Sequence, residues 1–309
     1  CIRDRVWPLP TVRHTAARPL RRPGRHVGRP PRGGQHEPTG ASVVSVTRVR
    51  PPAVAGKFYP DDPVRLRALL RSCFADAVAP AASAEPPKAL VVPHAGLVYS
   101  GPVAASAYLR LGAERGAIRR VVLLGPSHRV PLSGIGLTSA TEWRTPLGSV
   151  PIDHRHDELL LAHALVITHD EAHAPEHSLE VQLPFLQAVL DEFELLPLIV
   201  GRADAEQVAA VIEAVQAGDD TVVLVSTDLS HYHRYADAQR LDARTAAAIV
   251  ARRDGEIADL DAGGARPLRG LLRTAVAHDL EVEQIDLRNS GDTAGDRSRV
   301  VGYGAFALA

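Results

Sequence analysis

Three histidines, His94, His128 and His231, each follow a short apolar run of the chain and stand among small or polar residues. Imidazole titrates near neutral pH, and its neutral form is a common protein ligand for zinc, iron and copper. A metal held in this way supplies a Lewis acid, an activated water or a binding site for O₂. The pattern therefore predicts a metal site whose ligands are these three side chains.

The elements that position these histidines are predicted to be buried strands. Residues 89–92, 121–124 and 221–226 are short runs rich in valine and leucine, as expected for parallel strands covered on both faces. Helical patterns alternate with them, which indicates an α/β fold with a largely parallel central sheet and helices on both faces. Ligands of such sheets bind beyond the carboxyl ends of the strands, where all three histidines map.

Further elements follow from capping and turn residues. Asp204 is placed to cap a helix whose apolar residues recur with a period of 3.6. Residues 143–148 predict a turn, and residues 157–165 predict a helix. The strands expected at 282–287 and 300–308 follow one another without a helix, which favours an antiparallel edge of the sheet.

Other polar side chains near these positions are candidates for catalysis. Asp228 stands three residues before His231 and could be a carboxylate ligand or the acceptor that orients His231. Glu176 and His177 begin a predicted helix and could supply an acid or a base. With His231, these are the candidate catalytic residues. Two candidate substrate-binding residues stand close to the candidate ligands: Tyr99 and Ser127.

Each of these residues also has a simpler structural interpretation. A histidine after a strand often caps a loop or bonds to the backbone, but that coincidence would have to occur three times here. Charged side chains at a helix start are often only solvated. The sequence has no P-loop, no G-x-S-x-G elbow and no G-x-G-x-x-G after a strand, so the familiar nucleotide-binding and serine-nucleophile motifs are missing.

The charge distribution and the cysteines limit the compartment and the binding partners that we expect for this protein. Residues 1–50 hold eleven arginines against Asp4 and Glu37, a balance of +9, so a net charge of −1 leaves −10 on the remainder, which disfavours general nucleic-acid binding. No apolar run is long enough to span a bilayer, and the basic start lacks the apolar core of a signal peptide. Cys1 and Cys73 lie far apart, which fits a reducing compartment. We therefore expect a cytoplasmic protein that binds neither nucleic acid nor membrane.

The basic start of the chain differs from the rest. Residues 1–47 are rich in arginine, proline and glycine and have no sustained apolar period. Such a segment cannot bury enough surface to offset the entropy lost on ordering, so we predict a disordered extension. A basic arm that touches nucleic acid or anionic lipid is the alternative. Residues 48–309 are expected to form a single α/β domain.

Several separate motifs, in this order along the chain, resemble the Memo family, whose prokaryotic members are called AmmeMemoRadiSam system protein B. They are Pro-His-Ala-Gly, Gly-Pro-Ser-His, Glu-His-Ser-Leu-Glu, Ser-Thr-Asp-Leu-Ser-His and Gly-Tyr-Gly-Ala, at 93–96, 125–128, 176–180, 226–231 and 302–305. The resemblance covers about residues 49–309 and implies a fold similar to that of the class III extradiol dioxygenases.

What the resemblance implies for chemistry is a metal-dependent, dioxygenase-like oxidoreductase that acts on a small aromatic or carbonyl compound. Non-haem iron or copper is the expected metal, with zinc as an alternative. Eukaryotic members are described as metal-binding redox proteins and as adaptors for peptides that carry phosphotyrosine. The prokaryotic name implies radical-SAM and AMMECR-type proteins as partners.

The sequence departs from the family pattern at one ligand. In the family the metal is held by the histidines that match His94 and His128 together with a cysteine, which aligns with Gly263 in this chain. Glycine has no side-chain ligand atom, and neither cysteine of the chain can replace it by sequence position. The metal is then held by the three histidines, with Asp228 or Glu176 as a further ligand, or the site is degraded.

Two other functions remain open on the sequence alone. A degraded site would favour a non-catalytic module that binds a peptide or an anion in the same crevice. Metal-assisted hydrolysis needs only an activated water, and the same histidines would serve it.

Overall fold

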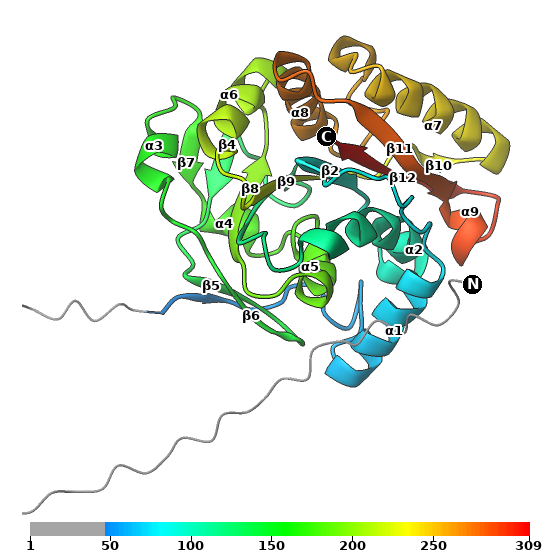
Figure 1. The fold of residues 1–309 in the computed structure, drawn as a ribbon, viewed down its shortest axis with the longest axis horizontal. Helices are drawn as coiled ribbons and strands as arrows, with labels where there is room; N and C mark the ends of the chain where they lie inside the picture. The colour runs from blue at the N-terminus through cyan, green and yellow to red at the C-terminus, as the bar shows by residue number, and fades with distance from the viewer. Residues whose placement is uncertain (1–46) are drawn as a thin grey trace, which may run out of the picture. The chain divides into compact units, whose positions relative to one another are not determined.

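Runs of valine and leucine form the central sheet of the computed structural model, which describes residues 47–309 (Figure 1). The disordered extension predicted for 1–47 lies outside the described residues except for Thr47. Within the described part, the strands are β1 (Val49–Arg50), β2 (Ala89–Val92), β3 (Arg120–Pro126), β4 (Ile135–Leu137), β5 (Glu142–Thr145), β6 (Gly148–Pro151), β7 (Val166–Thr168), β8 (Glu194–Val200), β9 (Thr221–Ser226), β10 (His231–His233), β11 (Val282–Asn289) and β12 (Val300–Leu308).

The sheet has a parallel centre and antiparallel flanks. Its order is β10-β12-β2-β9-β3-β8-β4-β7, with β11 also paired to β12. Strands β2, β9, β3 and β8 run parallel, and every residue of β2 and β9 is buried, as predicted for strands covered on both faces. Strands β11 and β12 form the predicted antiparallel pair, although β12 lies inside the sheet because it also pairs with β2. The α/β fold class is confirmed.

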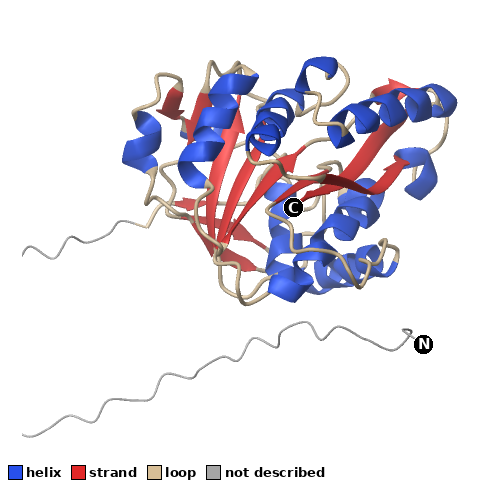
Figure 2. Ribbon diagram, turned by 45° about the horizontal axis from the view of Figure 1, so that its top comes forward, coloured by secondary structure: helices blue, strands red, loops and turns tan. Residues whose placement is uncertain are grey.

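Helices cover both faces of this sheet (Figure 2). Helices α6, α7 and α8 lie on one face, and α1, α2 and α5 lie on the other. In the described part of the chain the helices are α1 (Pro63–Ala75), α2 (Leu97–Tyr108), α3 (Asp157–Leu161), α4 (Asp170–His173), α5 (Leu183–Val189), α6 (Ala205–Val215), α7 (Tyr235–Val250), α8 (Ala265–Ala277) and α9 (Ser290–Thr293), with short 3₁₀ helices η1 (Leu109–Glu114), η2 (Glu180–Gln182) and η3 (Asp254–Glu256).

The helix predicted after Asp204 shows why these elements form. The Asp204 side chain accepts a hydrogen bond from the Gln207 backbone, and the Gln207 side chain bonds back to the Asp204 backbone, so α6 begins with a capping box. Its apolar stripe, Val208, Val211, Ile212 and Val215, is buried and belongs to the main hydrophobic core. The predicted cap at Asp204 is confirmed.

Two predicted local elements are present but shorter than expected. The turn expected at 143–148 is confined to 146–147, because strands β5 and β6 form a hairpin that also pairs with β1 in a separate three-stranded sheet. Buried Trp143 anchors that hairpin, with the Arg50 guanidinium 4.2 Å above its ring. The helix expected at 157–165 ends at Leu161, because the carbonyl of Leu165 accepts the Ile135 amide and draws the chain into an extended path toward β7.

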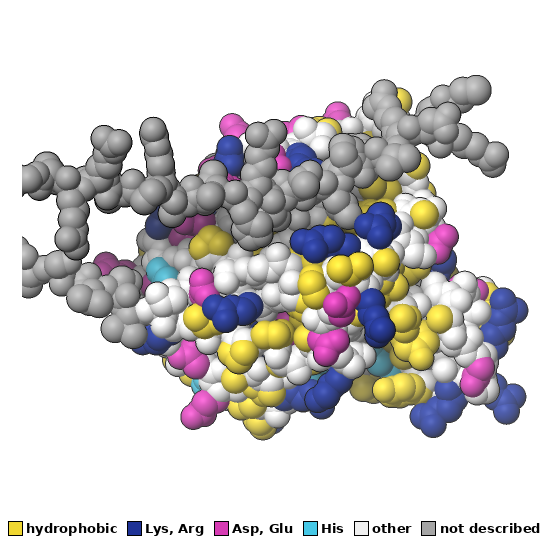
Figure 3. Space-filling view, turned by 90° about the horizontal axis from the view of Figure 1, so that it is seen from below, with side chains coloured by type: hydrophobic (Ala, Val, Ile, Leu, Met, Phe, Trp, Pro, Cys, Tyr) yellow, Lys and Arg dark blue, Asp and Glu magenta, His cyan; other side chains and the backbone are white. Residues whose placement is uncertain are grey.

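The surface and the helices carry two further observations. On the face shown in Figure 3, basic and acidic side chains alternate with apolar ones, without a large area of one charge. Among residues 47–309, no helix combines the length and the apolar character that a membrane crossing requires.

His173 gives the fold a defined pH dependence. This last residue of α4 is buried, its Nε2 donates to the carbonyl of Gly136 at 3.0 Å, and its ring packs edge-on against Trp143. Burial lowers the pKa of His173 from 6.5 to about 4. Between these values the unfolded chain binds more protons than the folded protein, so the free energy of unfolding decreases as the pH falls from about 6.5 toward 4.

Replacing His173 by glutamine removes this proton uptake. At the middle of the window, the slope of unfolding free energy against pH should be lower in His173→Gln by a substantial part of the ~1.4 kcal/mol per pH unit that one proton contributes. Urea unfolding of both proteins at several pH values between 4 and 7 measures it. The slope is compared rather than the absolute stability, since losing the Trp143 contact also costs stability. Equal slopes would contradict the role of His173.

Candidate metal centre

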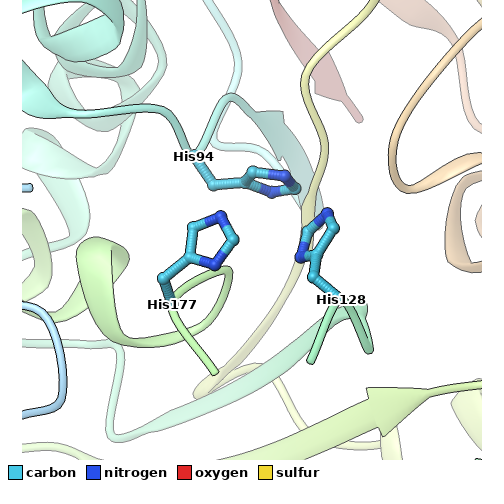
Figure 4. A group of neighbouring side chains, drawn as sticks. All are labelled: His94, His128 and His177. Carbon is cyan, nitrogen blue, oxygen red and sulfur yellow. The ribbon is translucent and has the colours of Figure 1, made fainter. Parts of the chain in front are cut away.

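Three imidazoles converge at the carboxyl edge of the parallel strands (Figure 4). His94 follows β2, His128 follows β3, and His177 lies in the loop between α4 and η2. Each offers one ring nitrogen, and these atoms lie within 4.8 Å of one another. The ring centroids are 4.7–5.5 Å apart, and Figure 4 shows the rings turned toward a common centre.

The hydrogen bonds behind His94 fix which of its nitrogens faces that centre. The hydroxyl of Ser226 donates its single proton to the carbonyl of Ser178 at 2.6 Å and accepts the Gln182 amide at 2.9 Å. Nδ1 of His94, 2.9 Å from the same hydroxyl, must therefore be the donor. The lone pair is left on Nε2, the nitrogen that a metal would bind.

Glu176 performs the same task for His128. Oε2 accepts the backbone amide of His128 at 2.6 Å, and Oε1 accepts the amides of His177 and Ser178. Oε1 also accepts Nδ1 of His128 at 3.0 Å, which leaves the lone pair of His128 on Nε2. Nδ1 of His177 is 3.0 Å from Oε1 as well, although without hydrogen-bond geometry.

These contacts give Glu176 the character of a positioning carboxylate rather than of an acid. Burial alone would raise its pKa, but the hydrogen bonds from His128 and His177 outweigh burial and hold the pKa of Glu176 well below its ordinary value. It is thus ionised at neutral pH and occupied on both oxygens. The structure places it behind the imidazoles rather than in the crevice.

The surroundings of His94 favour its neutral imidazole. His94 is buried, and burial lowers its pKa well below 6.5, with His128 and His177 lowering it further. Neutral imidazole carries the free electron pair that a metal requires. Three imidazole nitrogens form a borderline donor set, which suits iron, copper and zinc. The residues present therefore fit a divalent transition metal.

The cluster opens into a crevice of about 660 Å³. Tyr99, a predicted substrate contact, lines this crevice and is partly exposed. Ser127, the other predicted contact, does not line it: its hydroxyl donates to the carbonyl of Val130, and the residue borders a smaller, separate cavity. Residues of the wall that the sequence did not single out include Phe58, Arg129, Tyr232, Arg299 and Tyr303.

Asp228 and His231 lie on the wall of the same crevice. Oδ1 of Asp228 accepts the backbone amide of His94 at 2.7 Å, and burial raises the pKa of Asp228. Within residues 47–309 no hydrogen bond joins Asp228 to His231, so the expected orienting bond is replaced by the bond to His94. His231 is not one of the three convergent nitrogens, and its assignment as a ligand stays a prediction.

His177 is the residue whose place in the cluster sequence reasoning missed. It does not follow a strand, so the pattern that singled out the other histidines did not include it. The available signal was its neighbour: a glutamate directly before a histidine can hold a ligand loop by accepting its amides, as Glu176 does here.

The fold and the site together define an α/β protein with a histidine cluster beyond the carboxyl ends of its parallel strands. Residues 50–307 match the family described as "Memo-like protein", and the chain belongs to that family. It is similar to a MEMO1 family protein of Methanopyrus kandleri, with 38% identity over 84% of this chain and 98% of the relative. A MEMO1 family protein of Methanothermobacter thermautotrophicus is 37% identical, over 82% and 98%.

Among solved structures, the fold is similar to that of an uncharacterized Escherichia coli K12 protein, JW3007. The TM-score is 0.45 and the sequence identity is 14%, over 70% of this chain and 98% of that one.

Proposed function

We propose that the crevice binds one divalent transition metal, iron or copper with zinc as the alternative, and that the protein is a dioxygenase-like oxidoreductase. The observation that carries the proposal is the convergence of His94, His128 and His177, whose ring nitrogens lie within 4.8 Å of one another. The hydrogen bonds to Ser226 and Glu176 support it, because they leave Nε2 unprotonated on two of the three rings. When bound, such a metal supplies redox chemistry and a site for O₂.

The remaining side chains of the crevice take separate roles in this proposal. His231 is the acid or base, because it lines the crevice outside the three-nitrogen group. Asp228 lies beside it with a raised pKa and supports the proton transfer. Tyr99 orients an oxygen of the substrate from the outer wall. Glu176 keeps His128 in the ligand tautomer.

Metal content and oxygen uptake test the proposal. The full chain, purified without chelator, should contain about one equivalent of metal and should consume O₂ with a catechol or another small aromatic substrate. Acid release from esters or amides without O₂ uptake would replace the oxidoreductase by a metal-assisted hydrolase. Trace metal only, after reconstitution with iron, copper and zinc, would overturn the metal centre and favour a peptide- or anion-binding module.

A further inference from the structure

One position beside the histidine cluster, in the lining of the smaller cavity next to Ser127, lacks a side chain and faces the imidazoles. A Cβ atom built on Gly263 would lie 3.5 Å from Cε1 of His231 and 3.8 Å from Nε2 of both His94 and His128. These two Nε2 atoms are the ones whose lone pairs the hydrogen bonds leave free. The position of the missing Cβ at Gly263 therefore lies next to the same nitrogen atoms that would bind the metal.

The fold does not require glycine at this position. Gly263 does not have a positive φ, and its added Cβ would make only ordinary contacts of 3.5 Å or longer. The next residue is different, because a Cβ on Gly264 would come within 2.6 Å of the carbonyl oxygen of Ser226 and 2.7 Å of Cβ of Thr227. The space at position 263 thus exists because the residue is glycine, since the backbone there would accept a larger residue.

Hydrogen bonds fix this space relative to the cluster. The amide of Gly263 donates to the carbonyl of Asp228 at 3.0 Å, and the amide of Gly264 donates to the Thr227 hydroxyl at 2.8 Å. The carboxylate of Asp228 in turn accepts the amide of His94. Residues 227 and 228 therefore hold the backbone at Gly263 and Gly264, and Asp228 also holds the backbone of His94.

The three imidazoles leave the coordination position toward Gly263 open. Three imidazoles fill three positions of a metal that takes four or more ligands, and a site with an open position takes water or a small ligand there. Among the described residues, the only group close enough to chelate a metal is the three histidines, and the free thiol of Cys73 is buried against Gly101 on α2. No side chain of the described part takes the fourth position.

We propose that the space facing Gly263 binds a small monodentate anion from solution, which completes the coordination of the metal held by His94, His128 and His177. This inference rests on the metal centre proposed above. The imidazole of His231 borders the same space, with its Cε1 3.5 Å from the position of the added Cβ. The missing Cβ leaves room for a small ligand, since an atom placed there makes only contacts of 3.5 Å or longer.

Cobalt(II) and azide test the proposal spectroscopically, without reference to turnover. The full chain loaded with Co²⁺ should show a saturable change of its visible d–d bands on titration with azide. In Gly263→Cys the new thiolate should occupy the space, add a sulfur-to-cobalt charge-transfer band and weaken azide binding. Losing a residue that only orients a metal ligand changes metal affinity about 10–100-fold. A thiolate that occupies the azide position should have at least a comparable effect, so we expect azide affinity to fall by at least about tenfold.

Gly255→Cys is the matched control. It adds the same thiol at an exposed glycine of η3 whose Cβ would meet nothing within 4 Å, so its cobalt spectrum and azide affinity should equal those of the unmodified chain. If Gly263→Cys does not fold by circular dichroism, Gly263→Ala replaces it. Its added methyl fits without close contacts, and azide binding should still be weakened.

The outcomes separate this inference from the proposed function. A chain that binds no Co²⁺ overturns both. A chain that binds Co²⁺ with a spectrum insensitive to azide overturns only the open position. Equal azide affinity in Gly263→Cys and Gly255→Cys places the anion elsewhere and also overturns the proposed anion site. Where Gly263→Ala is used instead, an unchanged azide affinity has the same consequence.

Discussion

Replacing His94 by alanine is expected to abolish stoichiometric metal binding. His94 is 2% exposed, and Ser226 fixes its tautomer, so its Nε2 is the best-positioned nitrogen of the cluster. Losing a residue that only orients a ligand lowers metal affinity 10–100-fold, and losing a ligand itself should exceed that range. His128→Ala should behave in the same way, since Glu176 orients its ring. Metal analysis of each full-length variant, purified without chelator, measures the effect.

His233→Ala is the matched control for these variants. It removes an imidazole two residues beyond His231 that is exposed and does not line the crevice. It should retain the metal content of the unmodified chain. Equal metal content in His94→Ala, His128→Ala and His233→Ala would show that the metal is not held by the cluster.

Two further variants of the same series decide the third ligand. The structure groups His177 with the other two nitrogens, whereas the strand pattern of the sequence favours His231. His177→Ala should lose metal, and His231→Ala should keep it while losing activity. The reverse result would restore the ligand set expected from the sequence.

The positions of His94 and His128 were predictable because they depend on local patterns. Buried parallel strands need continuous valine and leucine, and a strand that ends in proline or small residues delivers the next side chain to the sheet edge. Strands β2, β9 and β3 are neighbours with matched register, so the two histidines meet although 34 residues separate them. Periodicity and strand order suffice for that conclusion.

The tautomers and the third imidazole were not predictable in this way. They depend on side chains from separate elements: Ser226 at the end of β9, Gln182 in η2, and Glu176 in the loop before it. Each contact joins residues 44 or more positions apart, and nothing in the local sequence specifies such a distance. The register of the whole α/β core must be known before these hydrogen bonds can be assigned.

A buried ion pair supports the loop that carries His177, and breaking it is expected to have the largest effect on stability. Glu180 is fully buried, and its carboxylate accepts hydrogen bonds from the Arg50 guanidinium at 2.7 Å and the Tyr59 hydroxyl at 2.7 Å. It also accepts the backbone amides of Ala53 and Val54. The pair joins the first strand of the described chain to η2, directly after the histidine loop.

Glu180→Leu should lower the free energy of unfolding by about 3–5 kcal/mol, because it leaves the charge of Arg50 buried without a partner. Urea unfolding at neutral pH measures the loss. The ion pair Arg240–Asp237 offers a control, since both side chains are exposed and Asp237→Ala should cost at most about 1 kcal/mol. Similar losses in the two variants would contradict the role of the buried pair.

A double variant separates the contribution of the ion pair to stability from its contribution to the metal site. Arg50→Met combined with Glu180→Leu removes both charges and should recover part of the stability, because an apolar pair avoids the cost of one unpaired buried charge. It should not restore the metal site fully. Arg50 also donates to the carbonyls of His173 and Glu176, which bound the loop before His177. We therefore expect the double variant to fold more stably than Glu180→Leu but to bind metal more weakly than the unmodified chain. Full metal affinity in the double variant would show that the loop is positioned without Arg50.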